Sequence, residues 1–64
     1  MFRVVITRTD DQDDTVFMSE SRNDAIAYFN TLLQLMRKRK MKWKAVSLYD
    51  NSKRIQIGEG EING

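Results

Sequence analysis

The chain has 64 residues, of which 41% are hydrophobic and 31% are charged, a composition typical of one small soluble domain. It contains no Cys, no His and no Pro, which excludes disulfide scaffolds, thiol nucleophiles, imidazole bases and zinc sites with Cys or His ligands. Its apolar runs are far shorter than the roughly 20 residues that span a bilayer, and residues 1–6 are too short for a secretory signal. We therefore expect a cytoplasmic protein that is not an enzyme, does not enter a membrane and needs no cofactor.

The charged residues are unevenly distributed, although the formal net charge is only +2. Residues 1–36 hold three basic and six acidic side chains, whereas residues 37–64 hold eight basic and three acidic ones. The acidic residues within positions 10–14 lack the spacing of a calcium-binding loop, so we expect no metal site. The acidic cluster comprises Asp10, Asp11, Asp13 and Asp14, and the basic cluster comprises Arg37, Lys38, Arg39, Lys40, Lys42 and Lys44.

The first third of the chain has the pattern of a β-hairpin. Residues 2–9 alternate, with Phe2, Val4 and Ile6 on one side, which is typical of a half-buried strand. Residues 10–14 form a polar break, and residues 15–19 return to a β-type composition.

An amphipathic helix is predicted over residues 22–40. Ser21 is a suitable N-cap for the backbone near Asp24, and Asp24 is placed to answer it in a capping box. Tyr28 and Leu35 lie on the flank of the apolar stripe, where they form either a second contact strip or the edge of the core. The stripe comprises Ala25, Ile26, Phe29, Leu32, Leu33 and Met36.

A second hairpin is predicted from residues 44–49 and 54–58, joined by the polar turn at 50–53. Alternation places Val46, Leu48, Ile55 and Ile57 toward the core. Residues 1–58 are then one domain, and residues 59–64, rich in Gly and Glu, are expected to form a flexible tail.

The element order predicts an α+β fold with two layers, ββαββ. One amphipathic helix packs on one face of a four-stranded, mainly antiparallel sheet, and nothing remains to cover the other face. The predicted register puts five partner-binding residues there, with Ala45 and Gln56 beside them. Alternatively, a bulge turns Phe17 toward the core. The five residues are Arg3, Val5, Phe17, Tyr49 and Arg54.

These features favour a small non-enzymatic protein that acts by protein–protein contact, either alone or as a homodimer. Domains of this size without catalytic groups are frequent among bacterial and phage accessory proteins that modulate a host protein, and we expect a role of that kind.

Nucleic-acid binding through residues 37–44 is the alternative function. Each Lys or Arg that neutralises a phosphate releases counterions, and a Trp beside them can stack on an unpaired base. Equally, the charges can serve the helix dipole and solubility, with Trp43 packed against the end of the helix. The residues concerned are Arg37, Lys38, Arg39, Lys40, Lys42, Trp43 and Lys44.

Overall fold

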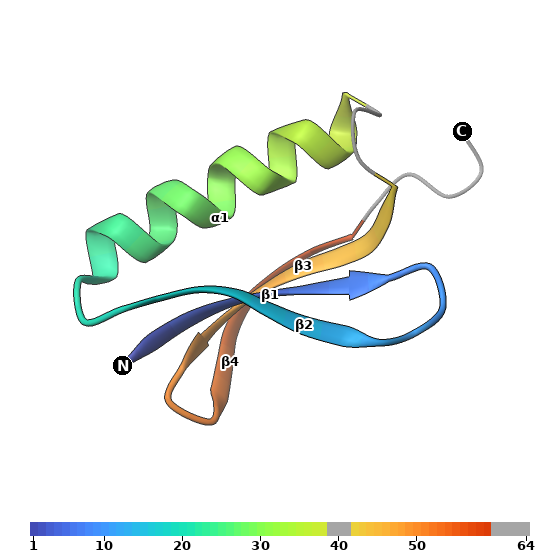
Figure 1. Ribbon diagram of the computed structural model, residues 1–64. Coiled ribbons are helices and arrows are strands. Elements are labelled where there is room, and N and C mark those ends of the chain that lie inside the picture. The colour runs from blue at the N-terminus through green and yellow to red at the C-terminus, as the bar shows by residue number, and fades with distance from the viewer. Residues whose placement is uncertain (39–41, 60–64) are drawn as a thin grey trace.

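The protein folds as one helix on a four-stranded antiparallel sheet, which confirms the predicted two-layer α+β architecture (Figure 1). The computed structural model describes residues 1–38 and 42–59. The sheet order is β2-β1-β3-β4, so the two hairpins meet through β1 and β3. In chain order the elements are β1 (Phe2–Arg8), β2 (Asp13–Ser19), α1 (Arg22–Arg37), β3 (Trp43–Asp50) and β4 (Lys53–Glu59).

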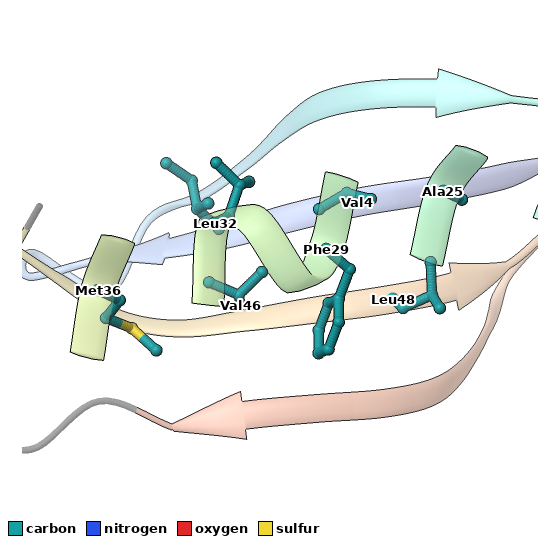
Figure 2. Close-up of a cluster of buried hydrophobic side chains, with 8 residues drawn as sticks. Val4, Ala25, Phe29, Leu32, Met36, Val46 and Leu48 are labelled. Atoms are coloured by element: carbon teal, nitrogen blue, oxygen red, sulfur yellow. The ribbon is translucent and has the colours of Figure 1, made fainter. Parts of the chain in front are cut away.

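The core lies between α1 and the inner strands. Val4 on β1 and Leu48 on β3 are paired on adjacent strands and point to the same side of the sheet. Both are fully buried, as is Phe29 of α1. Figure 2 shows the ring of Phe29 lying across β3 between Val46 and Leu48. Helical spacing of three or four residues aligns the buried positions of α1, which are Ala25, Phe29, Leu32 and Met36.

The helix is shorter than the sequence predicts. It ends at Arg37, and the backbone N–H of Lys38 caps it by donating to the carbonyl of Gln34. At the start, the Ser21 side chain accepts from the N–H of Asp24 at 3.3 Å, as predicted. The reciprocal half of the capping box is not formed, because the N–H of Ser21 donates to Ser19 Oγ at 3.0 Å.

Both hairpin turns use a residue in the left-handed backbone region, where Asp and Asn are tolerated better than most side chains. These are Asp11 with φ 68° and Asn51 with φ 57°. Asn51 also exchanges hydrogen bonds with Met1: its N–H donates to the Met1 carbonyl at 2.8 Å, and the terminal amine donates to its Oδ1 at 2.9 Å. The start of β1 is thereby fixed beside the β3–β4 turn.

Strand β4 extends one residue further than the predicted strand. Glu59 was expected in the tail but is the last residue of β4. Residues 60–64 of the predicted tail lie outside the described residues.

Candidate protein-contact surface

The side of the sheet opposite α1, called the open face below, is built from three transverse rows of side chains. Residues paired across neighbouring strands point to the same side, so the strand register defines each row. The arginine row is Met18, Arg3, Tyr49 and Arg54; the middle row is Thr15, Val5, Ser47 and Ile57; and the acidic row is Asp13, Thr7, Ala45 and Glu59.

None of the elements in residues 1–38 and 42–59 packs over the open face, as Figure 1 shows for α1 on the opposite side. Its centre is nevertheless buried: Val5 is 6% exposed, Ala45 8% and Ser47 3%. These side chains are short, and longer neighbours surround them. Two large apolar side chains of the same face project into solvent, Met18 at 56% and Ile57 at 44% exposure. The face therefore has a closed floor and a protruding apolar rim.

Arg3 is held in place at one end of the face. Its guanidinium lies 5.0 Å from the centroid of the Tyr49 ring, a cation–π arrangement. Its Nε and Nη2 donate to the carbonyl of Asn51 at 3.3 and 3.2 Å. The Asn51 carbonyl and the Tyr49 ring both restrain the Arg3 side chain. Binding of a ligand to Arg3 would therefore cost less conformational entropy than binding to an unrestrained arginine.

A hollow of about 270 Å³ lies on the β1–β2 side of the face, lined by Arg3, Val5, Asp13, Thr15 and Tyr49. At the end of the hollow where Asp13 lies, the Thr7 hydroxyl donates to Asp13 Oδ1 at 2.8 Å. The lining puts a guanidinium, a carboxylate and two hydroxyls in one place, which suits docking of a polar protein surface.

Four of the five predicted partner-binding residues lie on the open face, namely Arg3, Val5, Tyr49 and Arg54, and Ala45 lies there as well.

Phe17 does not lie on the open face, and its predicted place there is wrong. Val4 pairs with Phe17 and Val5 with Thr15, so Val16 is an extra residue in β2. This bulge shifts the alternation and turns Phe17 toward α1. There its ring stacks on Tyr28 with centroids 4.4 Å apart and planes 9° from parallel.

A second bulge corrects the prediction for β4. Leu48 pairs with Gln56 and Tyr49 with Arg54, which leaves Ile55 as the extra residue. Gln56, expected on the open face, therefore lies on the helix side. Ile57, expected in the core, pairs with Ser47 on the open face. Ile55 is 41% exposed and is not part of the core.

The two residues on the flank of the helix differ, and only Leu35 lies at the edge of the core. Leu35 is half-buried against the core cluster. Tyr28 is 36% exposed, with one side of its ring against Phe17.

The described residues of the basic cluster differ in exposure and in contacts. Arg37, Lys38 and Lys42 are exposed, whereas Trp43 is half-buried against the core. Lys44 forms an ion pair with Asp11. Arg39 and Lys40 lie outside the described residues.

The acidic cluster is partly neutralised by its own hairpin. Arg8 forms ion pairs with Asp10 at 3.0 Å and with Asp14 at 3.3 Å. The hydrogen bond to Asp14, together with the charges of both carboxylates, raises the pKa of Arg8. Among the described residues no group of acidic side chains is arranged to hold a metal ion.

Sequence reasoning missed five members of the open face: Asp13, Thr15, Met18, Ile57 and Glu59. Alternation of sides along β2 and β4 predicts the positions of Met18 and Ile57 correctly only when the extra residues Val16 and Ile55 are taken into account. No turn residue or glycine marks either bulge, so the sequence carries no clear signal for them.

Comparison of the chain with protein-family models, with curated proteins and with solved structures finds no match. Within the part of the chain that the structure describes, α1 is too short and too polar to cross a membrane.

Proposed function

We propose that this chain is a non-enzymatic binding protein that acts by protein–protein contact through the open face. One observation carries the proposal: a sheet face that no element of residues 1–38 and 42–59 covers displays Met18 and Ile57 beside a restrained Arg3–Tyr49 pair. Exposed apolar side chains next to an ordered arginine and an aromatic ring are the composition of protein interfaces.

The physiological setting belongs to the same proposal. A chain without Cys is suited to the reducing cytoplasm, and a small domain that offers one contact face suits an accessory role in which it occupies the surface of another protein. The absence of His and Cys from the sequence supports a role without catalysis.

A pair of variants with the same change tests the proposal. Ile57→Lys puts a charge in the middle row of the open face, whereas Gln34→Lys puts one on the exposed side of α1. The proposal predicts that the immobilised wild-type chain and the Q34K variant retain a stoichiometric protein partner in a pull-down. The I57K variant retains less than a tenth of it. Equal retention by I57K, with its circular dichroism unchanged, would contradict the proposal.

Nucleic-acid binding through residues 37–44 remains the second candidate, supported by the exposed cations Arg37, Lys38 and Lys42. The contacts of Trp43 with the core and of Lys44 with Asp11 favour the open face instead, because the aromatic ring and one cation of the cluster are already engaged.

A further inference from the structure

We infer that a second copy of this chain docks on the open face, with the two sheets face to face and a two-fold axis running along the middle row. The inference rests on the proposed function, because it names the partner of that same face. A two-fold dimer uses one patch twice, so the patch must be complementary to itself. The three rows of the open face meet this requirement in charge, shape and polarity.

Charge complementarity follows from the symmetry. A rotation of 180° about an axis along the middle row keeps each strand over its counterpart and reverses its direction. The arginine row of one copy then faces the acidic row of the other. On β4, Arg54 lies opposite Glu59 of the second copy, and the contact occurs twice. Both side chains are exposed, and neither has an ion-pair partner among the described residues of its own chain.

Shape complementarity appears on β3. The same rotation puts Tyr49, the largest side chain of the arginine row, over Ala45 of the second copy, the smallest side chain of the acidic row. Large side chains over small ones let two sheet faces approach to a normal packing distance.

The axis runs between the two sheets, parallel to the middle row, so each residue of this row faces its own counterpart in the second copy. Ile57 is 44% exposed in the single chain and would be covered by Ile57 of the second copy. Ile57 is thus buried between the two rows of charged side chains.

The residues on β2 are the least complementary part of the interface, because Met18 faces Asp13 of the second copy. Arg3 lies on the neighbouring strand β1, about 4.8 Å away, and its guanidinium can reach the Asp13 carboxylate. Two of its N–H groups go to the Asn51 carbonyl, and a guanidinium has further donors for the carboxylate.

The size of the patch sets the expected affinity. Four strands about 4.8 Å apart and five positions of about 3.3 Å give roughly 300 Å² per copy, or roughly 600 Å² in total, which is about half the area of the smallest standard-size interfaces. Packed sheets are also rotated by about 30°, a shift that the long Arg54 and Glu59 side chains can absorb. We expect a weak dimer that forms at about 10–100 µM protein.

Charge reversal tests this geometry. In sedimentation velocity, Arg54→Glu alone and Glu59→Arg alone should each weaken dimerisation at least tenfold, because each brings like charges together. An equimolar mixture of R54E and E59R should recover association as a heterodimer, because both of its contacts then join opposite charges. The matched controls are Lys53→Glu, at the neighbouring residue paired with Asp50 on the helix side, and Glu20→Arg in the β2–α1 loop. Both controls should dimerise like the wild-type chain.

The outcomes separate the inference from the proposed function. A wild-type chain that stays monomeric at about 1 mM would overturn the inference, as would single variants that dimerise normally or a mixture that fails to associate. The proposed function would survive any of these results if Ile57→Lys still abolished capture of a different protein. Circular dichroism of each variant excludes unfolding as the cause of a lost dimer.

Discussion

The two faces of the sheet are made by the same four strands, yet they differ in what fills them. The helix side brings large apolar side chains against Phe29, and Val4, Val46 and Leu48 are fully buried there. The open face buries only short side chains at its centre and displays its large ones. One helix can cover only one face of the sheet. The side chains of the other face are therefore not required for the core and can be suited to contact with a partner.

The same substitution on the two faces should give the largest contrast. Ile6→Thr, on the helix side, should lower the free energy of unfolding by about 2–4 kcal/mol, because it removes buried methyl groups and buries a hydroxyl. Ile57→Thr, on the open face, should change it by less than about 0.5 kcal/mol, because its side chain is exposed and both residues favour strands. Urea unfolding measures both, and equal losses would remove the distinction between the faces.

Gly58 tests how closely the helix side is packed at β4. It pairs with Val46 and lies under α1, where an added Cβ would overlap the side chain of Leu33. Gly58→Ala should therefore destabilise the fold by about 1–3 kcal/mol. The cost should fall in a Leu33→Ala background, because the overlapping atoms are gone. An equal cost in both backgrounds would mean that Gly58 is needed for another reason.

The Phe17–Tyr28 stack tests the corrected placement of Phe17. A double-mutant cycle with Phe17→Ala and Tyr28→Ala should give a coupling free energy of about 0.5–1.5 kcal/mol, as expected for stacked rings. If Phe17 were on the open face, it would lie across the sheet from α1. The two substitutions would then be additive within about 0.3 kcal/mol.

The smallest effect is expected outside both faces, at the basic cluster. Micromolar protein should give no mobility shift of single- or double-stranded oligonucleotides at about 50 mM salt. A shift that weakens steeply with salt, and that is lost in the variant with Lys38→Ala and Lys42→Ala, would instead favour the nucleic-acid candidate.

Much of the fold is predictable because its signals are local. The alternation in β1 and the helical spacing from Ala25 to Met36 depend on neighbouring residues, and both predictions are confirmed. Sheet order depends on how two hairpins meet, which no local pattern encodes.

The candidate surface was predictable only in part. Arg3, Val5 and Tyr49 lie in uninterrupted alternation and were placed correctly. Phe17 and Ile57 were not, because one extra residue in β2 and one in β4 reverse every side chain beyond it. Tertiary packing favours the bulge in β2, because the bulge lets Phe17 stack on Tyr28. A contact of this kind gives little signal in the amino-acid composition.

Oxidation of methionine by dilute peroxide, followed by mass spectrometry, measures whether the open face is exposed to solvent in the single chain, because the two faces carry methionines of opposite exposure. Met18 on the open face is 56% exposed and Met36 on the helix side is 4% exposed. We expect rapid oxidation of Met18 in dilute protein, slower oxidation of Met18 at high concentration, where a second copy covers the face, and protection of Met36 throughout. Equal protection of Met18 and Met36 in dilute protein would show instead that the open face is covered within the single chain and is not free to bind a partner.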